Sequence, residues 1–480
     1  MFAYHLPEGL PAGSRTVWSR LSLQPLSTEP LTPFSYSLLD EVAKSAWYHY
    51  FDELGFEPMP RARVLRQHEG RAYLNLTLST QRDAEQAAVE PLTLLVDQQP
   101  LALAKWEKPG LLASIKVGRN RKKIEQLLET YRQQISTVIQ KATAWYSKTQ
   151  ELRWTQADIL QIMEEVERVS IPSFTIFFAA RHNLELIYNR LLWALQARHP
   201  FPANAALLSQ AFHDVDGIYE ARMAVDYLTL GAMAAADQAT VAWLVADHSA
   251  DRNDNWQTTI PNQTFATAVA AFLQAYGHRA PAVGEISQAR WQEEPALLFT
   301  ELRTYVQKSA PAPKVKATAF DLQRLVEAAA PDQRKIVQQQ VQQARQLLRL
   351  QSQALDAFAY ILAGTRRWAL AAAKEAQGDQ RLLQTEDVFF FHLEEVKQMM
   401  TGEWNISSRQ AIHKTCEERK AAYARWAATG AAPLLIGDRA AFASQTEKPI
   451  SDEQTRNAQT ITHFHFWEKP YAYVYESASA

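Results

Sequence analysis

A long apolar seam in the second half of the chain is the feature that most strongly limits how this sequence can fold. Starting near Asp332, apolar side chains recur at heptad-like spacing, which is typical of one very long helix with a single buried stripe. Such a stripe needs a partner, either a helical hairpin within the chain or a second copy in a dimer. The seam consists of Val337, Val341, Ala344, Leu348, Leu355, Phe358 and Leu362.

Earlier segments show the same helical periodicity. From Arg119 onward, the apolar residues of 124–145 recur at three- and four-residue spacing, which predicts one long amphipathic helix. Thr155 and Asp158 then form a capping-box-like start for a second helix.

We expect this second helix to end at Pro172, because proline removes a helical hydrogen bond and clashes with the preceding turn. Residues 174–194 are apolar on most faces, so they predict a further helix at the centre of the fold.

The N-terminal part has a different character. Residues 1–118 are rich in proline and irregular in pattern, and residues 25–35 are predicted to be extended. Strand-like runs occupy residues 71–78 and 92–96. The sequence therefore predicts a mainly α protein, in which a multi-helix domain carries a smaller irregular, β-containing N-terminal part.

We divide the chain into an N-terminal part (1–118), a helical subdomain (119–308), a long-helix subdomain (309–449) and a C-terminal tail (450–480). Ser309–Lys316, SAPAPKVK, reads as a short flexible link. Polar and aromatic side chains alternate in the tail, which suggests a strand there.

Composition limits the class of partner. With 50 basic and 52 acidic residues, the net charge is −2, so the chain has no electrostatic footprint for nucleic acid or for an anionic membrane. Cys416 is the sole cysteine, which excludes an intrachain disulfide and a cysteine-based zinc site. The sequence shows neither a signal-peptide pattern nor an apolar run long enough to span a membrane, and we expect a cytoplasmic protein.

One connector between the helical halves, residues 276–298, is unusually rich in charged and special residues. Gly277 is expected to end a helix in the left-handed conformation, and Pro281 and Gly284 prevent a helix from continuing. Pro295 suits the first turn of the next helix. Because functional residues often lie on such rigid connectors, its charged residues are candidates for a binding site: His278, Arg279, Glu285 and Arg290.

Two interpretations of these candidates remain open. Arginine cations and a histidine can bind an acceptor of a phosphoryl group and orient its hydroxyl proton. Alternatively, Arg279, Glu285 and Arg290 pair in a buried network that only fixes the connector. Trp291 is expected to be a core residue in either case.

Two acidic segments, 213–220 and 247–254, invite a test for metal binding. Neither has the glycine and final glutamate of a calcium loop, nor the His-Glu-x-x-His spacing of a zinc helix. We therefore predict no metal site in the chain.

The connector resembles the "GHR…E…RW.E.P" segment in the central, substrate-binding region of PEP-utilising phosphotransferases of the rifampin phosphotransferase and PEP-synthase-like type. Residues 18–38 and 68–76 resemble that region's entry segments, although Glu69 stands where the family usually has glycine. The resemblance extends over roughly residues 16 to 440 and adds three arginines to the candidate substrate-binding residues: Arg71, Arg345 and Arg366.

Members of that family combine an ATP-grasp domain, a helical substrate domain and a swinging phosphohistidine domain. We find neither a phosphate-gripping constellation nor the "GG..SH.AI.ARE" run in this sequence. The resemblance thus implies that the chain binds no cofactor itself and assigns no certain catalytic residue.

The leading hypothesis is a small-molecule-binding subunit of a split phosphotransferase, in which separate ATP-grasp and phosphohistidine chains supply ATP and magnesium. The alternative is a non-catalytic helical small-molecule-binding or scaffold protein. The oligomeric state stays open.

Overall fold

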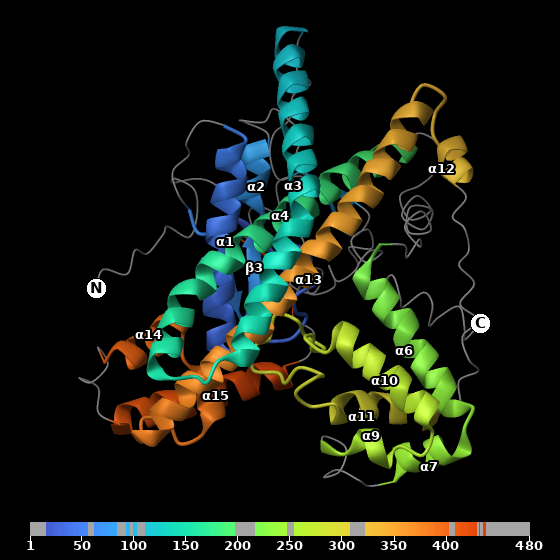
Figure 1. Cartoon of the computed structure of the whole chain (residues 1–480). Helices are drawn as coiled ribbons and strands as arrows, with labels where there is room; N and C mark the ends of the chain where they lie inside the picture. Colours follow the sequence, from blue (N-terminus) through green and yellow to red (C-terminus); the bar gives the residue numbers. More distant parts are fainter. Residues whose placement is uncertain are drawn as a thin grey trace.

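A computed structural model describes residues 16–55, 62–83, 93–96, 99–102, 111–196, 217–246, 254–307, 322–402, 409–429, 432 and 435–437. Helices dominate this part of the chain, which confirms the predicted mainly α fold (Figure 1). Its centre consists of three long helices that pack along one another: α3 (Leu111–Glu151), α4 (Gln156–Gln196) and α13 (Arg334–Gly378).

The apolar seam lies on α13 and is buried along its predicted length, from Val337 to Leu362. Its partners are α4 and α3 of the same chain, so the intramolecular alternative accounts for it. The helix predicted from Arg119 begins earlier, at Leu111. Trp145 on α3 and Phe358 on α13 both belong to the resulting core.

The predicted break at Pro172 is wrong, because α4 runs through this residue as one helix of 41 residues. A proline inside a helix costs about 3 kcal/mol. Burial of the following turns offsets that cost, since Phe174 and Phe177 are almost fully buried and the Phe174 ring lies 5.1 Å from that of Phe358. Arg168, whose carbonyl loses its helical partner, is on the exposed side of the helix.

The N-terminal part contains the expected strands. A four-stranded antiparallel sheet has the order β2-β3-β1-β6, and β4 pairs with β5 in a separate hairpin. The strands are β1 (Val17–Ser19), β2 (Leu65–His68), β3 (Arg71–Asn75), β4 (Thr93–Val96), β5 (Gln99–Ala102) and β6 (Leu435–Gly437).

Three helical segments of the N-terminal part were not predicted: η1 (Leu21–Leu23), α1 (Pro33–Glu53) and α2 (Leu76–Arg82). Pro33, interpreted as part of an extended run, opens α1 instead, behind Thr32 as the N-cap. The predicted strand 71–78 stops at Asn75, whose side chain accepts a hydrogen bond of 3.0 Å from Leu78 N and so caps α2.

The turn between β2 and β3 explains why glycine suits position 69. Glu69 has a φ of 47° and Gly70 a φ of 75°, so both residues are left-handed. A residue with a Cβ pays roughly 1–2 kcal/mol in that conformation. The glutamate at this position therefore places local strain in the hairpin.

A second apolar core belongs to a group of shorter helices, here called the small lobe (Figure 1, green to yellow). Trp243, Trp256, Phe265, Phe272 and Phe299 form its centre, and Trp291 packs on Phe272 as a core residue, as expected. The small lobe comprises α6 (Tyr219–Ala235), α7 (Gln238–Val245), α9 (Trp256–Thr259), α10 (Gln263–Tyr276) and α11 (Ala296–Gln307).

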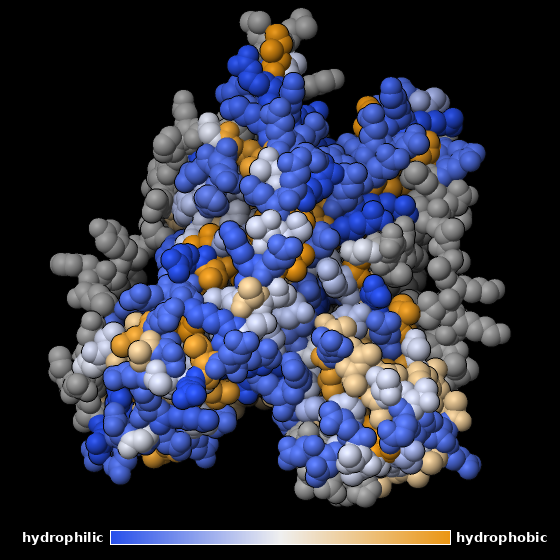
Figure 2. All heavy atoms as spheres, in the orientation of Figure 1, coloured by the Kyte–Doolittle hydropathy of each residue, from blue (hydrophilic) through white to orange (hydrophobic). Residues whose placement is uncertain are grey.

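The main body comprises the three long helices, the N-terminal sheet and α1, with four further elements. On the face drawn in Figure 2, a notch separates the small lobe from the lower part of the main body. The four elements are α12 (Leu322–Ala328), η3 (Thr385–Phe390), α14 (Leu393–Thr401) and α15 (Arg409–Ala428). The predicted link 309–316 and the predicted strand in 450–480 lie outside the described residues.

Among the described helices, none is by itself both long and apolar enough to cross a membrane, although the bent pair α6–α7 passes that test jointly.

Substitution of Gly364 tests the close contact between α13 and α3. A Cβ atom at this position would lie 2.5 Å from Cζ3 of Trp145 and 3.1 Å from Oγ1 of Thr149. We expect Gly364→Ala to lower the free energy of unfolding by about 1–3 kcal/mol, measured by denaturant titration. Gly118→Ala is the control, because a Cβ there meets no atom within 4 Å and should add about 0.5–1 kcal/mol of helix stability. Equal stability of the two variants would contradict the contact.

Candidate functional site

The connector between α10 and α11, residues 277–295, is here called the crossing segment. It folds back on itself, because Gln292 N donates to Gly277 O at 2.9 Å and Trp291 N donates to Arg279 O at 3.0 Å. The expected left-handed conformation of Gly277 is wrong, since its φ of −62° is ordinary helix. Glycine is needed for space instead: a Cβ would lie 2.3 Å from Leu273 O and 2.8 Å from Gln292 Cβ.

Asp356 on α13 is the acceptor for the first two candidates. His278 Nε2 lies 3.1 Å from Asp356 Oδ1, and Arg279 donates to the same oxygen from Nε at 2.9 Å and from Nη2 at 2.7 Å. Arg279 Nη1 also donates to Glu220 Oε1 on α6 at 3.0 Å. These four residues, His278, Arg279, Asp356 and Glu220, are here called the ion network.

The ion network is closed by packing. The side chains of His278 and Arg279 are 1% and 2% exposed, and the His278 ring stacks on Tyr360 with centroids 3.6 Å apart. Ser352 completes it by donating to Glu220 and accepting from Tyr219 N. In this arrangement neither His278 nor Arg279 presents an open face to a ligand.

Electrostatics of the ion network follow from burial and pairing. Burial alone would lower the pKa of Arg279, but Glu220 and Asp356 raise it above its ordinary value. Burial would raise the pKa of Asp356, but hydrogen bonds from His278 and Arg279 lower it. For His278, burial lowers the pKa and outweighs Asp356, whose charge Arg279 already neutralises. The network therefore holds a neutral histidine that donates to a carboxylate.

Glu285 is fully satisfied by groups of α1 and its own segment. Its Oε1 accepts from Thr32 Oγ1, Ser35 Oγ and Ser287 N, each at 2.8 Å, and its Oε2 accepts from Thr32 N at 2.7 Å. Glu285 thus caps the start of α1 across 253 residues of sequence. This carboxylate is a structural tie between the crossing segment and the main body.

Arg366 and Arg290 meet around Glu293. Arg366 on α13 donates to Glu293 Oε2 at 2.8 Å and to the carbonyls of Ile286 and Ser287 at 3.1 and 2.7 Å. Arg290 is 1% exposed and donates weakly to the Glu285 carbonyl at 3.5 Å. Burial lowers the pKa of Arg290 to about 10, so its guanidinium is charged at neutral pH.

Two candidate arginines lie elsewhere. Arg71 on β3 donates to the carbonyls of Thr28 and Thr429, which ties the N-terminal part to the end of α15. Arg345 is half-buried on α13, eleven residues before Asp356 and therefore about 16 Å away along the helix. Five of the seven candidates thus lie on or against the crossing segment, in two groups. His278 and Arg279 meet at Asp356, whereas Glu285, Arg290 and Arg366 lie at its middle part.

Sequence reasoning did not identify the partners of these residues. Asp356 carried a usable signal, because a carboxylate beside Leu355 and Phe358 in an apolar seam requires a buried cation. Glu220 and Thr32 carry no comparable signal, since both are common surface residues in sequence. Among the described residues, no group of three or more His, Cys, Asp or Glu side chains could hold a metal ion. Most of the acidic segments 213–220 and 247–254 lies outside them.

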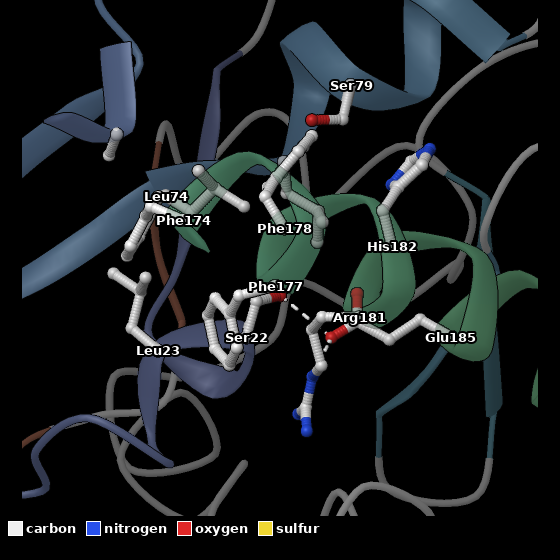
Figure 3. A pocket seen from close by; sticks show the side chains of 12 residues that line it. Ser22, Leu23, Leu74, Ser79, Phe174, Phe177, Phe178, Arg181, His182 and Glu185 are labelled. Carbon is white, nitrogen blue, oxygen red and sulfur yellow. Dashed lines mark hydrogen bonds and ion pairs between the residues drawn. The ribbon is translucent and has the colours of Figure 1, made fainter. Parts of the chain in front are cut away.

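A second polar cluster, also missed from the sequence, lines a small cavity between α4 and the N-terminal part (Figure 3). Glu185 Oε1 accepts from Arg181 Nε at 2.7 Å and from Ser22 Oγ at 2.8 Å, while His182 Nε2 lies 3.1 Å from Asp83 Oδ1. Phe174, Phe177 and Phe178 of α4 contribute to its wall, together with Leu23, Leu74 and Leu76. The cavity volume is about 20 Å³, which admits about one water molecule, so the cluster serves packing in this state.

Comparison with known protein families gives one match. Residues 172–355 match the rifampicin phosphotransferase fourth domain. This range holds the second half of α4, the small lobe, the crossing segment and the first half of α13. The chain therefore contains a rifampicin phosphotransferase-like domain. No curated protein matches the chain.

Asp356 tests whether the ion network holds the fold. Asp356→Asn leaves Arg279 buried with Glu220 alone and keeps the shape of the side chain. We expect the free energy of unfolding to fall by about 3–5 kcal/mol, because removing one partner leaves an uncompensated buried charge. Asp332→Asn, an exposed change just before the same helix, should stay within about 0.5 kcal/mol of the native protein. A small effect at position 356 would contradict a structural role.

The buried histidines predict opposite dependences on pH. The lowered pKa of His278 gives stability that is present above its unfolded value of 6.5 and is lost as the pH falls through it. For His182, burial lowers the pKa but Asp83 outweighs burial and raises it, so its contribution is present below 6.5 and is lost on the alkaline side.

We therefore expect His278→Asn to reduce the loss of stability between about pH 7.5 and about pH 5.5, and His182→Asn to increase it. Denaturant titrations at both pH values measure the two differences. If the two variants differ from the native protein in the same direction, the assignment is refuted.

Proposed function

We propose that this chain is a small-molecule-binding protein whose helical body corresponds to the acceptor-binding part of a rifampicin phosphotransferase-like enzyme. The match of residues 172–355 to a domain of a drug phosphotransferase is the observation that carries the proposal. The ligand would be a sizeable, partly apolar small molecule with a hydroxyl group.

The geometry of the crossing segment favours binding over chemistry by its own residues. A general base must lie within hydrogen-bond reach of the proton that it takes. His278 already donates to Asp356 and stacks on Tyr360, and Arg279 is fully engaged by Asp356 and Glu220. The ion network would therefore fix the small lobe against the main body, and a ligand would contact surfaces that this arrangement sets in place.

A second candidate function is the split phosphotransferase, in which separate ATP-grasp and phosphohistidine chains act on the ligand held here. The resemblance along roughly residues 16 to 440 to a phosphotransferase substrate region favours it. ATP and magnesium would then bind to the partner chains, and this chain would supply the acceptor alone.

Native purification from the protein's own cells tests both functions. We expect mass spectrometry to find a small molecule retained by the chain in excess of an unrelated protein carrying the same tag and purified in parallel. Stoichiometric recovery of an ATP-grasp chain and a phosphohistidine chain would establish the split enzyme. A preparation without ligand and without these chains would overturn both.

A second measurement uses the purified chain alone. With rifampicin as the probe, binding is expected to change the fluorescence of the 13 tryptophans, whereas incubation with ATP and magnesium should yield no phosphorylated drug. Phosphorylated product from the isolated chain would contradict a binding-only role.

A further inference from the structure

Arg290 is a buried guanidinium whose donors are largely unused. Its residue is 1% exposed, and its closest acceptor, the Glu285 carbonyl, lies at the 3.5 Å limit from Nη1. Within the described part of the chain, Nε and Nη2 have no hydrogen-bond partner. A buried charged group without acceptors is costly, so native proteins normally supply a counter-charge or a bound molecule.

Arg367 repeats this situation beside Arg290. Its Nη2 donates to the Tyr146 hydroxyl at 3.0 Å, and its guanidinium lies 4.4 Å from the centre of the Tyr146 ring. Its Nη1 is buried, again with no acceptor among the described residues. Tyr146 also donates to Gln292, two residues after Arg290 in the crossing segment. Burial raises the pKa of the Tyr146 hydroxyl, while the charges of Arg367 and Arg290 both oppose that rise, so both arginines act on this phenol.

The carboxylates nearby do not balance these cations. Glu293 Oε2 is taken by Arg366 Nε and by the backbone N–H of Arg290. The four hydrogen bonds of Glu285 all come from hydroxyl and backbone groups, so none of its carboxylate oxygens accepts from a guanidinium. Glu293 and Glu285 still stabilise the charge of Arg290 through space. Three guanidinium groups, those of Arg290, Arg366 and Arg367, thus face two carboxylates, and of the three it is Arg366 that bonds one directly.

We propose that Arg290 and Arg367, together with Tyr146, form a binding site for an oxyanion, namely a phosphate or carboxylate group. The forked guanidinium offers paired N–H donors that match the oxygens of such groups, and a site with little competing water strengthens each bond. Arg366 holds Glu293 and the crossing segment in place beside the site and adds a third positive charge.

The site lies directly beneath exposed residues. Tyr146 donates to Gln292 Oε1 at 3.1 Å, and Gln292 is exposed. The Glu293 side chain is 24% exposed. Movement of the Gln292 side chain would expose the Tyr146 hydroxyl and the Arg367 guanidinium bonded to it. The ion network would stay intact, because His278 and Arg279 bind Asp356 on a different turn of α13.

This inference rests on the proposed function, since it assigns an anionic group to the ligand of the same domain. Its test is independent of that ligand, because inorganic anions are the probes. Failure of anion binding would leave retention of an uncharged small molecule unaffected, and failure to retain any small molecule would leave an anion site measurable.

The experiment follows thermal unfolding of the full chain in phosphate, acetate and chloride at matched ionic strength. We expect the unfolding midpoint to rise with the logarithm of phosphate or acetate concentration relative to chloride, as binding to the native state requires. If phosphate raises the midpoint at a lower concentration than acetate, the site binds a phosphate group. If acetate does so at the lower concentration, the site binds a carboxylate. Midpoints that match those in chloride would overturn the proposal.

Variants locate the effect. Arg367 is half-buried, so the Arg367→Gln variant should fold, and we expect it to lose the anion-dependent rise of the unfolding midpoint. The control variant Arg121→Gln, at an exposed position, should retain the full rise. Arg290→Met should also lose the rise while its midpoint without anion increases, because an unpaired buried charge is replaced by an apolar chain. An anion-dependent rise that persists in Arg367→Gln would place the anion elsewhere and refute the site.

Discussion

Much of the structure depends on one carboxylate, that of Asp356, which accepts hydrogen bonds from His278 and Arg279 across 77 and more residues of sequence. A charged residue in the apolar seam of α13 is unfavourable unless a cation is brought to it. The crossing segment brings that cation, and Glu220 at the start of the small lobe shares it. The requirement to neutralise Asp356 therefore fixes the position at which the small lobe packs on the main body. Apolar contacts between the two cores would fix this position less precisely.

Periodicity predicted the long helices well, because burial of an apolar stripe is a property that each segment carries in its own sequence. The local signals were less reliable. Pro172 does not end α4, since packing of the phenylalanines beyond it outweighs one lost hydrogen bond. Pro33 opens a helix because Thr32 precedes it as a cap, and Gly277 is required by a close approach and not by its backbone angle. At Pro172 and Gly277 the deciding contact comes from a residue distant in sequence, Phe358 and Gln292 respectively, whereas at Pro33 it is the neighbouring cap.

In the candidate site, too, the residues could be selected from the sequence whereas their contacts could not. Residue type and clustering were sufficient to select His278, Arg279, Glu285 and Arg290 as buried residues of one connector, but Arg279, Glu285 and Arg290 do not pair with one another as the structural interpretation supposed. Their partners depend on how α13, α6 and α1 pack, and the sequence does not fix that packing. Arg345 illustrates the limit, because it shares a helical face with Asp356 yet lies too far along α13 to join the ion network.

Satisfaction of hydrogen bonds separates the two groups of buried charge on the crossing segment. Both side-chain oxygens of Glu285 accept a hydrogen bond, and every side-chain nitrogen of Arg279 donates to a carboxylate, so the fold already uses these groups. Arg290 and its neighbour Arg367 on α13 retain buried donors that meet no acceptor among the residues the structure describes. If all of these charges served only to hold the fold, selection for stability would favour an apolar side chain at position 290, as it does where buried ions are not needed. A cation kept at a cost to stability is the pattern expected of a binding site, and it lies next to the network that keeps the site in place.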